Sequence, residues 1–148
     1  LYLVARQNLE WIATIVVAVH GVIWRDQITL KFVAKDWDLG AFYSAAFDWS
    51  SIQTAFLFGV YAFFLGRSEA FLKAVSSSPF FPMLRQFVVR SLYLSMALTV
   101  LSLPFLVAPP PIQELMGYAV FLVISCLFVF TFFCFIKVVR VFGMIERH

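Results

Sequence analysis

The apolar run Leu115–Ile136 near the end of this chain has no charged residue over 22 consecutive positions. A helix of about 20 apolar residues is long enough to cross the hydrocarbon core of a bilayer. In water, a helix that is apolar all round would have to be covered on every side by other elements. This run therefore favours a membrane protein before any other feature is considered.

Composition extends this inference to the whole chain. Of its 148 residues, 63% are hydrophobic and only 13% are charged, whereas a soluble domain carries about 25% charged residues. A soluble monomer of this size could not cover so much apolar surface. We predict a single all-α membrane domain with four transmembrane helices in an up-down bundle that associates into oligomers. The predicted spans are residues 9–24, 52–66, 91–108 and 115–136.

The basic residues predict the orientation of these spans. With four spans, eight Lys and Arg residues fall on one side of the membrane and three on the other. Short cytoplasmic loops collect Lys and Arg, so both termini are predicted to be cytoplasmic, in the inner (plasma) membrane of a bacterium. The remaining segments are then an outer loop at 25–51, a cytoplasmic hairpin at 67–90 and a cytoplasmic tail at 137–148.

The outer loop is rich in aromatic and acidic residues, which is typical of segments at the headgroup level. We expect it to lie on the outer leaflet, as a short surface helix at most, and not to fold as a separate domain. Ser50 followed by Gln53 has the spacing of a capping box and predicts that the second span begins there. The prolines at 109–111 predict a stiff outer turn after the third span.

Small and hydroxyl-bearing residues predict how the helices pack. Because lipid tails are as apolar as Leu, close backbone approach and interhelical hydrogen bonds drive association in membranes. Two stripes at helical spacing are expected to face each other, and a Ser/Thr stripe that lines a polar pore is the alternative. The stripes are Ala55, Gly59, Ala62 and Gly66 on the second span, and Ser91, Ser95, Thr99 and Ser102 on the third.

The first and fourth spans give weaker packing signals. The first has a smaller set in Thr14, Ala18 and Gly21. The fourth presents a row of Phe rings, which we expect to face lipid or a neighbouring subunit. These rings belong to Phe121, Phe128, Phe132 and Phe135.

Few residues suggest chemistry. Glu10 and His20 are the ionisable side chains within the first span, and such residues are candidates for function by default. Glu10 is expected to pair with Arg6, Arg85 or Arg90, or to belong to a proton path. His20 is expected to have an interfacial or packing role, or a ligand or proton-linked one. We expect Cys126 and Cys134 to be packing residues, because about 12 Å of helix separates them.

These residues predict no enzyme, no cofactor and no metal site, and the net charge of +3 is read as a membrane-orientation signal and not as a nucleic-acid footprint. Six basic residues near the cytoplasmic side are expected to contact anionic lipid or a cytoplasmic protein. They are Arg67, Lys73, Arg85, Arg90, Lys137 and Arg140.

The segment "FLFGVYAFFLGRSEAFLKAVSSSPFFPMLRQFVVRSL" covers about a quarter of the chain. It resembles a layout that recurs in small bacterial inner-membrane proteins, in which a glycine-containing helix leads through a basic amphipathic turn into a third span. Some of these proteins are encoded beside phage-defence or nucleotide-signalling partners. The resemblance implies a membrane subunit that works with a cytoplasmic partner, and it assigns no active residue.

Three functional hypotheses follow. The first is a non-enzymatic membrane subunit that self-assembles and presents its cytoplasmic side to a partner protein. The second is an oligomeric pore lined by the Ser/Thr stripe. The third is an accessory helix bundle within a larger membrane complex.

Overall fold

The computed structural model describes residues 8–65 and 81–145, with the side chains of residues 8–62 and 84–140. Within these ranges the chain forms five helices and no strand, which confirms the all-α prediction. The helices are α2 (Leu9–Ile23), α3 (Arg25–Val33), α4 (Leu39–Leu65), α6 (Phe81–Val107) and α7 (Leu115–Ile145).

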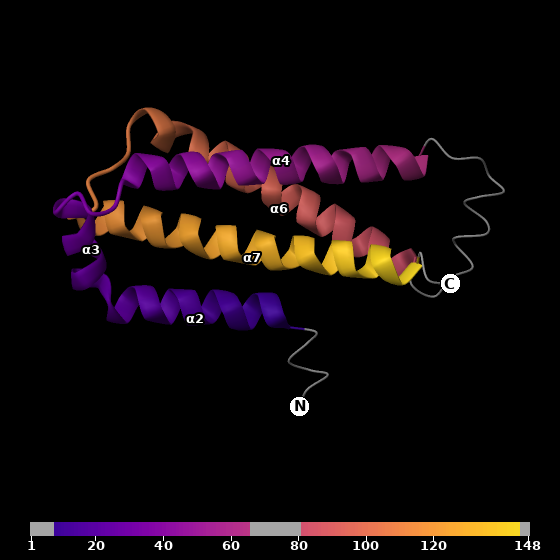
Figure 1. Ribbon diagram of the computed structural model, residues 1–148, viewed down its shortest axis with the longest axis horizontal. Coiled ribbons are helices and arrows are strands. Elements are labelled where there is room, and N and C mark those ends of the chain that lie inside the picture. The colour runs from indigo at the N-terminus through magenta and orange to yellow at the C-terminus, as the bar shows by residue number, and fades with distance from the viewer. Residues whose placement is uncertain (1–7, 66–80, 146–148) are drawn as a thin grey trace.

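The four long helices run up and down along one axis, and α3 lies across one end of the bundle (Figure 1). Helix α7 has a central position, because it packs against α2 on one side and α6 on the other. Helix α4 packs mainly against α6. The helices therefore follow the spatial order α2–α7–α6–α4, and α2 depends mostly on a single long neighbour.

Two helices of the described chain are long and apolar enough to cross a membrane, over Leu84–Val107 and Leu115–Arg140. Helix α2 is apolar but has only 15 residues. Helix α4 is long, with 27 residues, but Tyr43, Asp48 and Gln53 interrupt its apolar sequence. It is therefore not apolar enough to count as a spanning helix. The structure therefore supports two spanning helices, and the expectation of four spans is not supported.

The segment expected as a loop at 25–51 is helical over most of its length. Helix α4 begins at Leu39, and Ser50 and Gln53 lie in its interior instead of at its start. The N-cap is Asp38, because its Oδ1 atom accepts hydrogen bonds from the backbone amides of Gly40 (2.8 Å) and Ala41 (3.3 Å). The capping box predicted at Ser50 is wrong, because this Asp provides the actual cap.

Helix α3 covers the end of the bundle where α4 and α7 begin. Its apolar residues Ile28 and Phe32 pack against Ile112 and Phe121. The ring centres of Phe32 and Phe121 are 5.3 Å apart in an edge-on arrangement. The short helix expected in this segment is α3, and its position on the outer leaflet stays a prediction.

Two glycines allow close backbone approach beside α7. A Cβ atom on Gly117 would collide with the carbonyl of Pro111, so the proline turn can pass directly against the first turn of α7. A Cβ atom on Gly21 would collide with Leu122, and the hydroxyl of Tyr118 donates a hydrogen bond to the carbonyl of Gly21. Close approach through a small residue therefore joins the last turns of α2 to α7.

Asp38→Ala tests the observed start of α4. The substitution removes the acceptor for two amides of the first turn, and we expect a loss of about 1 kcal/mol of unfolding free energy. Asp48→Ala is the matched control, because Asp48 is an exposed acid in the interior of the same helix. Unfolding by denaturing detergent, followed by circular dichroism, measures both variants. Equal effects of the two substitutions would contradict the assignment of the cap.

Candidate functional site

A buried ion pair joins α2 to α7. The Nζ atom of Lys137 contacts the Oε2 atom of Glu10, and the two side chains are only 16% and 3% exposed. Carboxylates and ammonium groups are rarely buried to this extent unless they are paired. The charges compensate each other, so the pair fixes how α2 and α7 lie side by side.

Arg90 of α6 lies beside this pair. Its guanidinium carbon is 5.2 Å from the ring centre of Phe130 and 5.9 Å from that of Trp11. The two rings also contact each other edge-on, with 4.8 Å between their centres. Cation–π contacts of this kind contribute about 0.5–2 kcal/mol, and more in desolvated surroundings. We call Glu10, Lys137, Arg90, Trp11 and Phe130 the ionic cluster, because here three helices bring their charged residues together.

The ionic cluster corrects two expectations. Glu10 pairs with Lys137, and not with Arg85 or Arg90; Arg6 lies outside the described residues. Lys137 is buried in a pair, so it is not a free contact for lipid or a cytoplasmic protein. Both corrections have one cause, since a charge in apolar surroundings is stabilised most by an opposite charge within a few ångströms.

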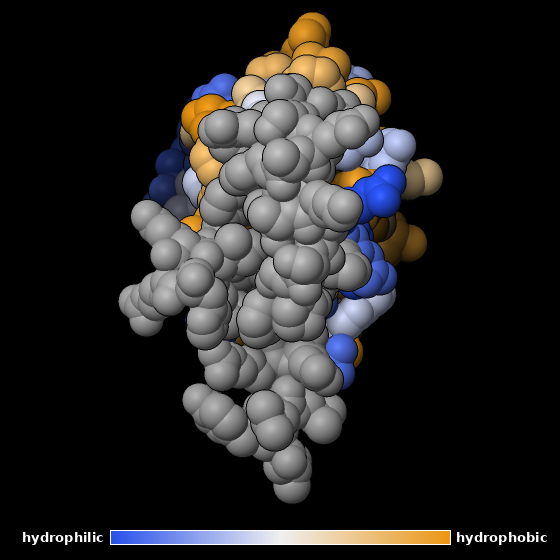
Figure 2. Space-filling model, turned by 90° about the vertical axis from the view of Figure 1, so that its right-hand side faces the viewer, coloured by the Kyte–Doolittle hydropathy of each residue, from blue (hydrophilic) through white to orange (hydrophobic). Residues whose placement is uncertain are grey.

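The remaining basic residues at this end differ from one another. Arg85 and Arg140 are exposed, whereas Arg90 is half-buried. Gly66, Arg67 and Lys73 lie outside the residues whose side chains the structure describes. In the end-on view of Figure 2, hydrophilic residues appear at both edges of the bundle and hydrophobic residues gather at the top.

Hydroxyl and amide groups line the seam between α4 and α6. Ser91, Ser95 and Ser102 are fully buried, and Thr99 is partly buried. The seam contains two interhelical hydroxyl pairs, Thr54 with Ser95 at 3.0 Å and Thr99 with Ser50 at 2.9 Å. The predicted Ser/Thr stripe of the third span thus lies against α4, within one chain.

Gln53 connects three helices in the centre of this seam. Its Nε2 atom donates to the hydroxyl of Ser91 on α6 at 3.0 Å and to the backbone carbonyl of Thr131 on α7 at 3.1 Å. The side chain is only 1% exposed. Such bonds average about 0.6 kcal/mol in membrane proteins, so their main effect is to specify which faces meet.

The stripe predicted for α4 faces away from this seam. Ala55, Gly59 and Ala62 are exposed, and a Cβ atom on Gly59 would meet nothing within 4 Å. The seam instead uses the opposite face of α4, with Tyr43, Ala46, Ser50, Gln53 and Leu57. Polar groups decide this choice, since turning Ser50 and Gln53 toward lipid would leave them without partners.

The row of Phe rings on α7 also lies elsewhere than expected. Phe121 is buried, and the ring of Trp49 on α4 packs against those of Phe128, Phe132 and Phe135, with ring centres 5.3–6.5 Å apart. The expectation that these rings face lipid or a neighbouring subunit is wrong for Phe121, which is buried, whereas the other three rings are half-buried against Trp49.

An apolar groove with a volume of about 440 Å³ runs between α2, α6 and α7. Its walls are Trp11, Thr14 and Ala18 of α2 and Leu94 of α6, and α7 forms its floor from Leu122 to Phe130. The groove exists because α2 and α6 pack on the same helix, α7, without filling the space between them.

His20 and the two cysteines do not form a cluster of potential metal ligands among the described residues. His20 is exposed, stacks on Trp24 with 5.4 Å between ring centres, and lines a smaller groove of about 210 Å³ between α2, α3 and α7. Cys126 contributes to the floor of the larger groove, and Cys134 is buried. Among the described residues, no three His, Cys, Asp or Glu side chains come together as a metal site.

Comparisons of the chain with protein-family models, with curated proteins and with solved structures find no match.

Sequence reasoning identified Glu10 but missed both Lys137 as its partner and the groove. A signal for the pair was present. Glu10 is near the N-terminus of α2 and Lys137 is in the C-terminal half of α7, so antiparallel packing of the two helices brings both residues to the same end of the bundle. Trp49 and Gln53 were missed because they fell inside the expected loop and cap. The groove leaves no pattern along the chain, because it depends on the order in which the helices pack.

Substitutions in the buried pair test its role. Glu10→Gln leaves a buried ammonium without its carboxylate and should cost about 3 kcal/mol of unfolding free energy. Adding Lys137→Met removes the uncompensated charge and should restore most of this loss. The matched control is the exposed pair Lys31–Asp36, 2.9 Å apart, where Asp36→Asn should cost less than about 1 kcal/mol. Denaturing-detergent titrations provide the measurement, and equal losses for Glu10→Gln and Asp36→Asn would contradict the buried pair.

Proposed function

We propose that this protein is an integral membrane subunit without catalytic chemistry of its own, which self-assembles and presents one end of its bundle to a cytoplasmic protein. The observation that carries the proposal is the exposure of the two spanning helices. Only 28% of each spanning window is buried inside the chain, although both windows are almost free of charge. A soluble protein would bury its most apolar helices, so lipid is the surroundings that fits them.

In this proposal α2 and α4 also lie within the bilayer, so that the chain passes through it four times. Helix α2 turns a row of large apolar side chains outward, among them Ile15, Val19 and Val22, each at least half exposed. Ile52 and Phe58 do the same on α4. The short α2 needs local thinning of the bilayer or tilted packing against α7, both of which occur with short spans.

Self-assembly is supported by the outward face of α4. Ala55, Gly59 and Ala62 form a narrow strip that is exposed in the single chain. Small residues allow two helices in lipid to approach closely, so a second copy of the chain can pack there. By contrast, the hydroxyls of Ser95 and Thr99 are already bonded within one chain, which favours a subunit over a pore lined by them.

The proposed docking surface consists of Arg85 and Arg140, which are exposed at the same end of the bundle. Arg90 and Lys137 lie inside and are engaged in the ionic cluster. The excess of basic residues at this end supports its cytoplasmic location. The sequence resemblance supports a partner of the defence or signalling kind, encoded beside such membrane proteins.

Labelling of single introduced cysteines tests the membrane location. In a chain with Cys126 and Cys134 replaced by Ala, Lys35→Cys and Glu114→Cys should react with an impermeant thiol reagent from outside the cell. Arg85→Cys and Arg140→Cys should react only after the membrane is permeabilised. Labelling of positions 85 and 114 from the same side would refute the proposed crossing of α6.

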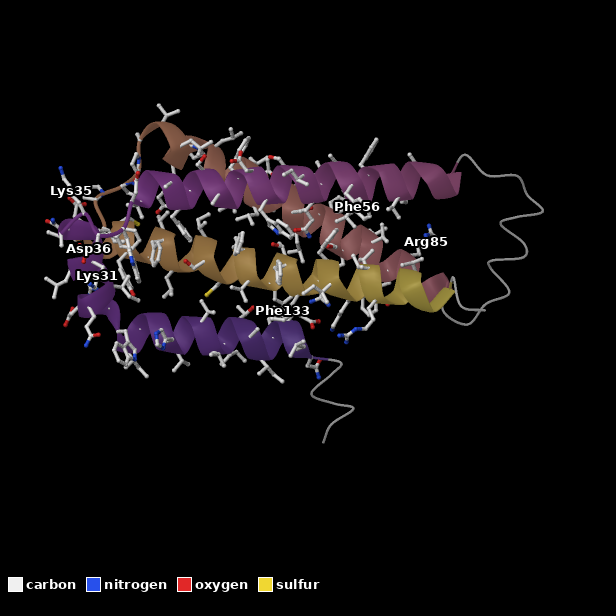
Figure 3. All side chains as sticks on the ribbon, viewed as in Figure 1. Lys31, Lys35, Asp36, Phe56, Arg85 and Phe133 are labelled. Carbon is white, nitrogen blue, oxygen red and sulfur yellow. The ribbon has the colours of Figure 1, made fainter. Side chains whose placement is uncertain are left out.

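Charge reversal tests the docking surface. We expect Arg85→Glu with Arg140→Glu to reduce cross-linking to the cytoplasmic partner at least tenfold, with insertion and oligomeric mass unchanged. Lys31→Glu with Lys35→Glu is the matched control, because these lysines lie at the opposite end of the bundle from Arg85 (Figure 3). Quantitative cross-linking in intact membranes measures both pairs, and an equal loss in both would rule out docking at this end.

A further inference from the structure

We propose that the groove between α2, α6 and α7 binds one acyl chain of an anionic phospholipid, whose phosphate is held by Arg90. This inference rests on the membrane location proposed above. It assigns the groove and the ionic cluster to one ligand.

The groove suits a hydrocarbon chain. Its lining consists of apolar side chains apart from Thr14, and the hydroxyl of Thr14 donates a 2.7 Å hydrogen bond to the carbonyl of Glu10. The floor from Leu122 to Phe130 covers nine residues of α7, and its ends are about 12 Å apart along the helix. A groove of this length with no free polar group fits part of an extended acyl chain.

A cation lies at one end of this groove. Arg90 is one helical turn from Leu94, so both side chains project from the same face of α6. Its guanidinium lies over Trp11 and Phe130, and both of these residues line the groove. A ligand that extends from the groove past these two rings therefore comes close to Arg90.

The charge balance of the ionic cluster calls for an anion. Glu10 carries one negative charge, whereas Lys137 and Arg90 carry one positive charge each, and the carboxylate of Glu10 contacts Lys137. Within the described part of the chain, Arg90 has ring contacts but no carboxylate partner. A half-buried guanidinium in apolar surroundings is stabilised by an anion, and its planar donors match the oxygens of a phosphate.

The depth of Arg90 fits a headgroup from the inner leaflet. Arg90 lies nine residues from Phe81, the first residue of α6, or about 14 Å along the helix. A long Arg side chain at this depth extends toward the interface, where phosphates lie. A helix from a second copy could also fill the groove with apolar side chains, but it would supply no anion, so we favour the phospholipid.

The test is native mass spectrometry of the intact protein, released from detergent with equal amounts of phosphatidylglycerol and phosphatidylethanolamine. We expect the unmodified chain to retain one phosphatidylglycerol in preference to phosphatidylethanolamine. Arg90→Gln removes a charge-assisted contact and should weaken retention of phosphatidylglycerol about tenfold. Arg90→Lys should keep most of the preference, and Arg85→Gln, an exposed cation of the same helix, should change it less than twofold.

A second variant tests the acyl chain itself. Leu94→Trp narrows the groove and should reduce retention of the lipid about tenfold, whereas Val100→Trp on the exposed face of α6 should not. Thermal unfolding in detergent verifies that each variant is folded. If Arg90→Gln does not fold, the comparison of Leu94→Trp with Val100→Trp still tests whether the lipid binds in the groove.

Equal retention by Arg90→Gln and Arg85→Gln, or by Leu94→Trp and Val100→Trp, would overturn the inference. Retention of both lipids to the same extent by the unmodified chain would do so as well. These outcomes are distinct from failure of the proposed function, because the cysteine labelling pattern reports insertion and crossing whether or not the groove holds lipid.

Discussion

The burial of charge in apolar surroundings is the constraint on which the arrangement of this bundle depends. A buried carboxylate or ammonium loses several kcal/mol of hydration, and only close pairing compensates for the loss. Glu10 and Lys137 belong to different helices and meet at one point, so the pair specifies the position of α2 along α7. Arg90 adds a third helix through its ring contacts, and the charges of α2, α6 and α7 therefore converge in one small region.

The other half of the bundle is held by different forces. Helices α4, α6 and α7 meet through the amide of Gln53, through paired hydroxyls and through the rings around Trp49. Each of these contacts is weak, but hydrogen bonds and ring contacts are directional, and together they select one face of each helix. The bundle thus joins an interlocked trio of helices to a fourth helix, α2, which packs on α7 through a charge pair, a glycine contact and the rings of Trp11 and Phe130.

How much of this arrangement the sequence predicts depends on how many helices each feature involves. The all-α fold and the Ser/Thr stripe of α6 follow from composition and helical period within a single element. The choice between the two faces of α4 does not follow from the helical period of that helix alone. One face carries Ala55 and Gly59 and the other carries Ser50 and Gln53, and both sets have helical spacing. The cost of exposing Gln53 to lipid decides between them only once the partners on α6 and α7 are in place. The first turns of α4 lie in a segment whose aromatic and acidic residues predict an outer loop at the headgroup level.

The attachment of α2 has a mechanical consequence. The helix is held to α7 near its two ends, by Glu10 at one and by Gly21 at the other, about 16 Å apart along its axis. The backbone contact at Gly21 carries no charge, whereas the contact at the Glu10 end combines an ion pair with the ring contact of Trp11 and Phe130. Two attachments at this separation fix the direction of α2 as well as its position along α7.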